Sequence, residues 1–103
     1  MAKFLYVYHG GKAPSSPEEG QKVMQEWMAW CASLGDAVAD SGNPLGMSKT
    51  VSPTGIADDG GANPVSGYSL VNAADIDTAV AMVQNCPMLA DGGSVEVAEC
   101  FDM

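Results

Sequence analysis

The chain has a single histidine, His9, which stands where an apolar run ends and a glycine pair begins. Imidazole titrates near neutral pH, so a histidine at the end of a strand can move protons within a pocket. Glu96, in an alternating segment near the C-terminus, supplies a carboxylate partner if both side chains share one face of a sheet. A shift of one residue in strand register reverses that arrangement, so a histidine that only hydrogen-bonds loop backbone is the alternative.

Aromatic side chains accompany this pair. Tyr8, Tyr68 and Trp27 supply walls suited to a flat or apolar small molecule. The two tyrosines are the better candidates for a lumen because a buried hydroxyl needs a polar partner, whereas Trp27 and Trp30 at helical spacing are more typical of a helix core. The predicted site therefore comprises His9 as the catalytic residue, with Tyr8, Tyr68, Trp27 and Glu96 as binding residues.

Metal and disulfide chemistry are not expected. Cys31, Cys86 and Cys100 are odd in number and widely spaced, with no C-x-x-C pair and one histidine to join them. We interpret Cys31 and Cys86 as small buried apolar residues rather than reactive thiols. The sequence DDGG at 58–61 lacks the spaced ligands and the closing glutamate of a calcium loop, so it predicts a solvated turn. We expect neither a metal nor a cofactor.

The first elements are indicated by patterning and capping. Residues 3–9 are aromatic and β-branched, and Gly10 follows, which predicts a buried strand. Ser16 before Pro17, with Glu19 three residues after the serine, is typical of a helix start in which the glutamate bonds back to the cap. The apolar period then runs to Gly35, a left-handed C-terminal cap.

The middle of the chain carries weaker signals. Residues 36–40 predict a short strand that ends in the turn SGNP, and residues 47–51 form either another strand or an irregular continuation. Residues 52–67 are rich in Gly, Pro, Asp and Asn without a period, which predicts an exposed loop. Residues 68–72 then read as a central strand.

The C-terminal third repeats the helix and strand order. Asp75 caps a helix predicted over 76–86, which Pro87 stops, and residues 94–100 alternate as a strand. The order strand, helix, strand, strand, helix, strand predicts a single α+β domain over 1–103, a ferredoxin-like βαββαβ fold. Its antiparallel sheet carries both helices on one face.

The first strand is apolar on both faces, with Phe4, Tyr6 and Tyr8 on one and Leu5 and Val7, followed by His9, on the other. A strand of this kind is buried on both sides. Since the helices cover one face, a second copy packed sheet to sheet would cover the other. The sequence therefore predicts a homodimer.

Composition excludes several partners. The 103 residues are 47% hydrophobic and 17% charged, with a net charge of −9 and no arginine. A chain so acidic is repelled by phosphate, which argues against nucleic acids and anionic membranes. No apolar run approaches the length of a membrane span, and the N-terminus does not resemble a signal peptide, so a cytoplasmic location is expected.

Five segments, YHGG, SPEEG, GYSLVNAADIDTAV, CPML and GGSVEVAE, are spread along the chain. Together they resemble the YCII-related family, also called the DGPF family, over nearly the whole length of the chain. This resemblance implies a dimeric α+β barrel, in which two ferredoxin-like subunits face their sheets to enclose pockets. The namesake stretch is matched only by Asp59 and Gly60, and the helix start SPEEGQK lacks the histidine that one branch of the family has been suggested to pair with an aspartate.

Two functions follow from these observations. The first is a cofactor-free enzyme that performs acid–base chemistry, an isomerisation or elimination, on a small cyclic or aromatic metabolite in the barrel pocket, with His9 as the acid–base group. The second is a non-catalytic module, accessory or regulatory, that binds a small molecule or a partner. A pocket and a carboxylate beside His9 would favour the enzyme, and a histidine held only by backbone would favour the binding module.

Overall fold

The aromatic N-terminal run lies at the centre of a four-stranded antiparallel sheet in this computed structural model, which describes residues 2–11 and 14–102. The strand order is β2-β5-β1-β6, and every neighbouring pair is antiparallel. The sheet consists of β1 (Ala2–His9), β2 (Val38–Pro44), β5 (Val65–Ala73) and β6 (Ser94–Cys100). The predicted α+β class with an antiparallel sheet is therefore confirmed, and the first and last strands fall close to their predicted bounds.

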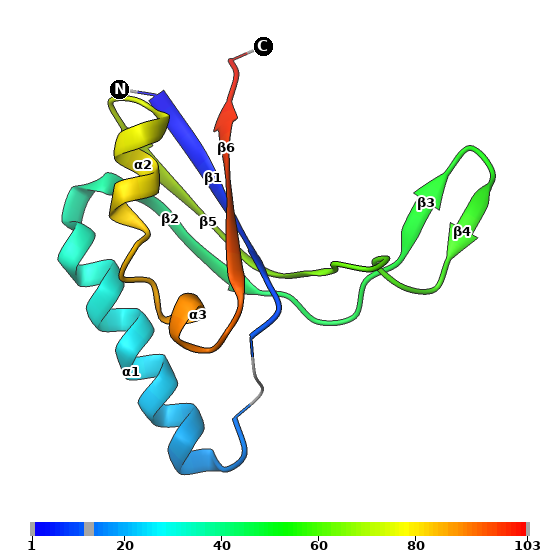
Figure 1. Cartoon of the computed structure of the whole chain (residues 1–103), viewed down its shortest axis with the longest axis horizontal. Helices are drawn as coiled ribbons and strands as arrows, with labels where there is room; N and C mark the ends of the chain where they lie inside the picture. The colour runs from blue at the N-terminus through cyan, green and yellow to red at the C-terminus, as the bar shows by residue number, and fades with distance from the viewer. Residues whose placement is uncertain (1, 12–13, 103) are drawn as a thin grey trace.

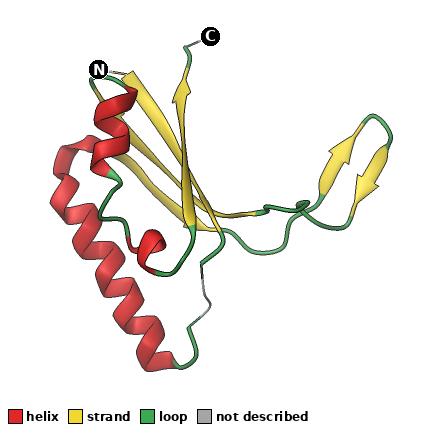
Figure 2. Ribbon diagram, in the orientation of Figure 1, coloured by secondary structure: helices red, strands yellow, loops and turns green. Residues whose placement is uncertain are grey.

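All helices lie on one side of this sheet, as Figures 1 and 2 show. The long helix α1 (Pro17–Leu34) begins as predicted, with the Ser16 side chain accepting from the Glu19 backbone N–H at 3.1 Å, and ends at Gly35 with a φ of +58°. The Glu19 carboxylate does not return to the cap residue but accepts from the Ser15 hydroxyl and backbone N–H. The second hydrogen bond of the capping box is therefore made to Ser15 instead of to the cap residue Ser16.

The predictions for residues 36–44 were partly wrong. Gly35–Ala37 form a 3₁₀ turn, and β2 continues through the stretch expected to be a turn. The pairing of β2 with β5 shifts register twice, and Gly42 (φ +77°) makes the bend, with its N–H donating to Asp40 Oδ1 at 2.8 Å. A glycine kink therefore replaces the predicted chain reversal.

The second helix is also shorter than predicted. The helix α2 (Ile76–Met82) is capped by Asp75, which accepts from Thr78, but it ends at Met82 rather than Cys86. Pro87 begins a new short helix, α3 (Pro87–Ala90), because proline at the first helical position sacrifices no backbone hydrogen bond.

An extended arm replaces the structureless loop expected at 52–67. Residues 50–57 form a hairpin of β3 (Thr50–Ser52) and β4 (Gly55–Ala57), which projects from one end of the main sheet (Figure 1). Of the strand predicted at 47–51, only residues 50 and 51 fall in β3. A two-stranded hairpin alone is only marginally stable in water, and every residue of β3 and β4 is exposed.

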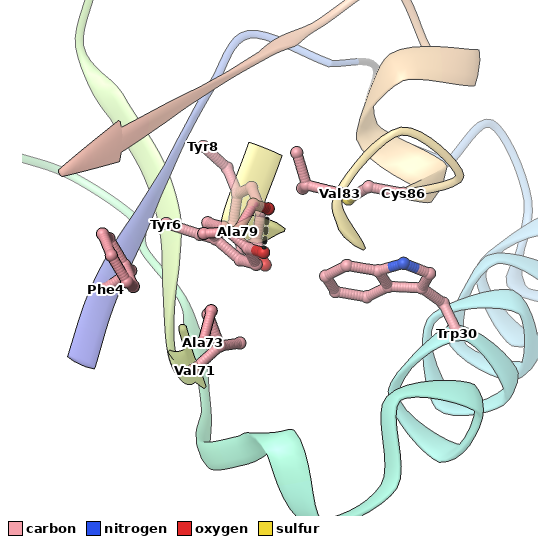
Figure 3. Packing of buried hydrophobic residues seen from close by; sticks show 9 residues of the cluster. All are labelled: Phe4, Tyr6, Tyr8, Trp30, Val71, Ala73, Ala79, Val83 and Cys86. Carbon is pink, nitrogen blue, oxygen red and sulfur yellow. Dashed lines mark hydrogen bonds between the residues drawn. The ribbon is translucent and has the colours of Figure 1, made fainter. Parts of the chain in front are cut away.

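The hydrophobic core lies between the helices and the sheet (Figure 3). Phe4 and Tyr6 of β1 are fully buried, and the Tyr6 hydroxyl donates to the Ala79 carbonyl of α2 at 2.5 Å. Trp30 of α1 covers them, with its ring 6.2 Å from that of Tyr6. The alternation of β1 thus sends Phe4, Tyr6 and Tyr8 toward the helices, while Leu5, Val7 and His9 lie on the opposite, open face.

Among the helices of the described chain, none is both long and apolar enough to cross a membrane.

Candidate functional site

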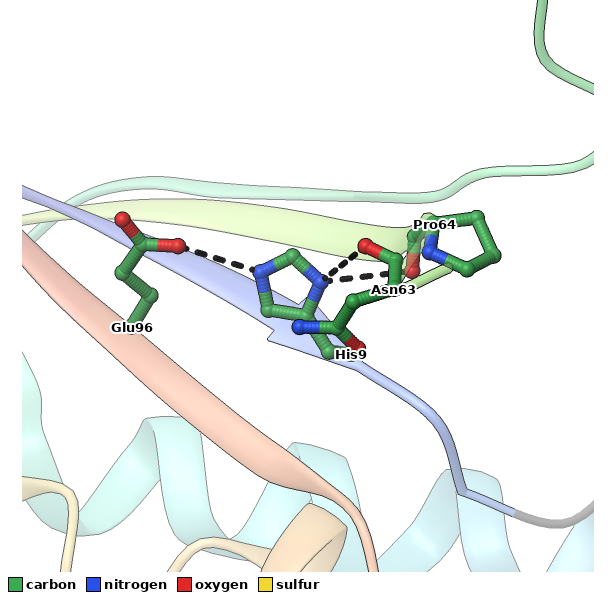
Figure 4. Close-up of polar contacts among 4 residues, drawn as sticks. All are labelled: His9, Asn63, Pro64 and Glu96. Atoms are coloured by element: carbon green, nitrogen blue, oxygen red, sulfur yellow. Dashed lines mark hydrogen bonds and ion pairs between the residues drawn. The ribbon is translucent and has the colours of Figure 1, made fainter. Parts of the chain in front are cut away.

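The register of the two central strands brings His9 and Glu96 together. Val7 of β1 lies opposite Glu96 of β6, and His9 lies opposite Ser94, so His9 and Glu96 are diagonal neighbours on the open face. His9 Nε2 is 3.2 Å from Glu96 Oε1 (Figure 4). The question that sequence alone left open, whether these residues share a face, is answered by this register.

The other ring nitrogen of His9 faces backbone. Nδ1 lies 3.1 Å from the carbonyl oxygen of Asn63 and 3.3 Å from that of Pro64, where the arm returns to the sheet (Figure 4). A bulge creates this contact, because the pairing with β5 shifts after Tyr8 and sets His9 opposite Val65 instead of Ser66. The His9 imidazole therefore joins β1 to residues 63 and 64, where the arm returns to the sheet.

The two ring nitrogens of His9 face different kinds of acceptor. Carbonyl oxygens only accept hydrogen bonds, so Nδ1 interacts favourably with those of Asn63 and Pro64 as a donor. Nε2 faces a carboxylate oxygen, which also accepts, so a proton between Nε2 and Oε1 makes this contact a hydrogen bond.

The two partners differ sharply in exposure. The His9 side chain is only 9% exposed, whereas that of Glu96 is 68% exposed. The imidazole is thus fixed from both sides, and the carboxylate can contact a molecule on the open face. A carboxylate held in this way can exchange a proton with a molecule on the open face, while the imidazole fixes its position.

Tyr68 belongs to the same face. It lies opposite Val7 on β5, so Tyr68, Val7 and Glu96 form one row across three strands. Its hydroxyl accepts from Asn43 Nδ2 of β2 at 3.2 Å. Tyr68 is half-buried and places a phenol ring on the side of the sheet where His9 and Glu96 lie.

Tyr8 and Trp27 lie on the other side of the sheet. Their rings are 4.9 Å apart and near perpendicular between β1 and α1. The Tyr8 hydroxyl donates to Ser69 Oγ at 2.8 Å, and Ser69 donates to the Ser41 carbonyl at 2.7 Å. Burial raises the pKa of Tyr8 above its usual value of 10, so this phenol stays protonated. The predicted site residues thus fall into two groups on opposite faces.

The three cysteines are free thiols. Cys86 is buried beneath the sheet, and burial raises the pKa of its thiol to about 11, while burial also raises that of the half-buried Cys31. A thiol with a raised pKa is a poor nucleophile at neutral pH. Within residues 2–11 and 14–102, no three His, Cys, Asp or Glu side chains are grouped as a metal site requires.

Sequence reasoning missed the backbone partners of the site. The carbonyls of Asn63 and Pro64 position His9, yet backbone carbonyls leave no trace in residue types. Ser69, which holds the Tyr8 hydroxyl, was missed as well, although a small polar residue on the inner face of a central strand is a usable signal.

No protein-family model matches the chain, and no curated protein matches it.

Proposed function

We propose that the chain is a YCII-related, ferredoxin-like domain that pairs as a homodimer through the open face of its sheet. The strand order β2-β5-β1-β6 with all helices on one face supports this proposal, as do the sequence segments described above. Leu5, Val7 and Leu70 are half-buried on the open face, where no helix covers them. Burial of these side chains against a second copy would stabilise both.

The arm supports the same assembly. Its apolar side chains are almost bare, with Met47 93%, Val51 76% and Ile56 69% exposed. Isolated exposed apolar residues are common, but two on a projecting hairpin and a third shortly before it are typical of an interface. A two-fold partner would allow each arm to contact the other copy.

We expect the chain to sediment at about twice its 10.6 kDa mass. Leu70→Glu, which sets a charge on the open face opposite Leu5, should shift the protein to monomer with its helical circular dichroism retained. Leu89→Glu is the matched control, since Leu89 is exposed on α3, on the helix side of the sheet, and it should leave the dimer intact. A wild-type chain that stays monomeric at high concentration would refute the assembly.

The activity we propose is acid–base catalysis at the His9–Glu96 pair, and the 3.2 Å contact between them is the observation that carries it. The pair shares one proton, takes a second from a carbon next to a carbonyl group of the substrate, and returns one of the two at another carbon. The net reaction is an isomerisation without a cofactor. Fixing the imidazole at Nδ1 preorganises the pair and lowers the cost of orienting it during the reaction.

The substrate class follows from the neighbours of the pair. The phenol ring of Tyr68 and the apolar side chain of Val7 lie in the same cross-strand row as Glu96. They suit a small cyclic or aromatic molecule with a carbonyl group, whose flat face packs on the tyrosine. With a net charge of −9, the chain disfavours highly anionic substrates.

Proton exchange tests this activity directly. The chain is incubated in D₂O with a panel of small cyclic ketones and enones, and deuterium incorporation is followed by NMR. We expect Glu96→Gln and His9→Gln to lower the exchange rate by about 10²-fold or more, the usual contribution of a positioned acid–base group. Glu99→Gln, three residues along β6 and opposite Phe4 on the other face, is the control and should retain the wild-type rate.

A second candidate function is favoured by one observation: both ring nitrogens of His9 are engaged, and the ring is buried. On this view His9 ties the arm to the sheet in a non-catalytic binding module. His9→Gln would then lower the free energy of unfolding, and neither wild type nor variant would exchange deuterium into any member of the panel.

A further inference from the structure

A cavity of about 410 Å³ lies on the helix side of the sheet, between the first half of α1 and the adjacent ends of the central strands. Its volume is in the range of small-molecule sites. His9 and Glu96 do not line it, because both lie on the open face. The residues that shape its wall include Tyr8, Gly20, Val23, Met24, Trp27 and Met88.

The wall is apolar and aromatic. The Tyr8 and Trp27 rings meet edge to face at 4.9 Å, and the Tyr8 hydroxyl is committed to Ser69, so the ring is what remains for a ligand. Met24 and Met88 add flexible thioether side chains that adapt to ligand shape. No described lining residue is charged, and burial of an unpaired charge is costly. The ligand that fits is therefore uncharged.

Two features of the wall leave room for a ligand and a place for one polar group. Gly20 lies within α1, where glycine costs about 1 kcal/mol relative to alanine. A Cβ atom there would meet only Pro14 at 3.6 Å, so packing does not require the glycine. Ser66, also on the wall, has a buried hydroxyl without a hydrogen-bond partner among the described residues. A buried hydroxyl of this kind gains from a ligand oxygen or nitrogen.

We propose that this cavity is a second ligand site, separate from the His9–Glu96 pair, for an uncharged aromatic or alicyclic molecule with a single hydrogen-bonding group. The aromatic pair of Tyr8 and Trp27 stacks on the ring of the ligand, and Ser66 meets its polar group. This inference stands whether or not the open face is catalytic, because it depends on Tyr8, Trp27 and Ser66 and not on His9 or Glu96; Tyr68 is the one residue of the open-face row that also lines the cavity.

Fluorescence of N-phenyl-1-naphthylamine, a neutral probe with one N–H group, tests the proposal. The probe should bind at one site per chain and quench tryptophan emission through Trp27. Gly20→Leu, which projects a side chain into the cavity, should weaken binding by about tenfold or more, the equivalent of two methylene-sized groups excluded from the pocket. Gly20→Ala fits at 3.6 Å from Pro14 and should largely preserve binding.

Further variants separate this site from other surfaces. If Gly20→Leu does not fold, Val23→Trp replaces it, since Val23 is half-buried on the same wall. Loss of binding in the arm variant Val51→Ser/Ile56→Ser, with Gly20→Leu unaffected, would overturn the proposal. Equal binding of the anionic 1-anilinonaphthalene-8-sulfonate would overturn the uncharged ligand class. Glu96→Gln should leave probe binding unchanged, so failure here and failure of the proposed activity are distinguishable.

Discussion

Gly42→Ala is expected to destabilise the protein by about 3 kcal/mol or more, although it adds only one methyl group. A Cβ atom at this position would lie 1.6 Å from the carbonyl oxygen of Tyr68, far inside van der Waals contact, and Gly42 has a φ of +77° that other residues rarely adopt. Backbone of both β2 and β5 would have to move. Chemical denaturation followed by circular dichroism measures the loss.

Gly46→Ala is the matched control four residues away. Nothing lies within 4 Å of its would-be Cβ, and its φ is not in the left-handed region, so we expect a change of at most about +1 kcal/mol in stability. If both variants have the same stability, the kink at Gly42 does not hold β2 on β5. Because the kink sets Asn43 opposite Tyr68, Gly42→Ala should also release the Asn43–Tyr68 hydrogen bond on the open face.

The kink at Gly42 could not be predicted from the local sequence. SGNP has the composition of a turn, and a local pattern cannot distinguish a turn from a strand that a glycine bends across its neighbour. The contact that decides the matter, between Gly42 and the Tyr68 carbonyl, joins residues 26 positions apart. By contrast, the cap at Ser16 and the alternation of 94–100 depend on near neighbours, and both were predictable.

The residue types of the candidate site were predictable from the sequence, but their relative positions were not. Residue types nominated His9 and Glu96, and the alternation of β1 placed His9 on a different face from Tyr8. Their joint position depends on register and on the bulge after Tyr8, which pattern alone does not fix. The arm is a similar case, since the loop composition of 52–67 concealed the pairing of β4 with β3. Short strands carry too few residues for a periodic signal.

The predicted site residues lie on two faces of the sheet and do not form a single pocket. A single pocket would have required the tyrosines, Trp27 and the acid–base pair to converge. Instead, the His9–Glu96 pair lies on the uncovered face of the sheet, and the aromatic cavity lies beneath α1. The sheet separates the two, and neither His9 nor Glu96 lines the cavity.

The free energy of unfolding is expected to stay level up to about pH 9 and then to fall as the pH rises toward 12. The reason is that the core contains thiol and phenol groups that remain protonated in this range only while they are buried. Burial raises the pKa of Cys86 from 9.0 to about 11 and that of Tyr6 from 10.0 to about 12, and that of Tyr8 is raised as well. The unfolded chain therefore loses these protons at lower pH than the folded chain. Ionisation favours the unfolded state throughout that window.

The expected loss is roughly 2 kcal/mol for each of Cys86 and Tyr6, less than the full shift implies because the unfolded chain retains some structure. Urea denaturation at pH 7, 9, 10 and 11 measures it, and tyrosinate absorbance shows ionisation that coincides with unfolding. Tyr6→Phe removes the hydrogen bond to Ala79 and costs about 1 kcal/mol at pH 7, yet it should flatten the alkaline slope. Cys86→Ala should flatten it further between pH 9 and 11. A double variant as steep as wild type would show that repulsion among the surface charges, rather than these buried groups, drives the alkaline unfolding.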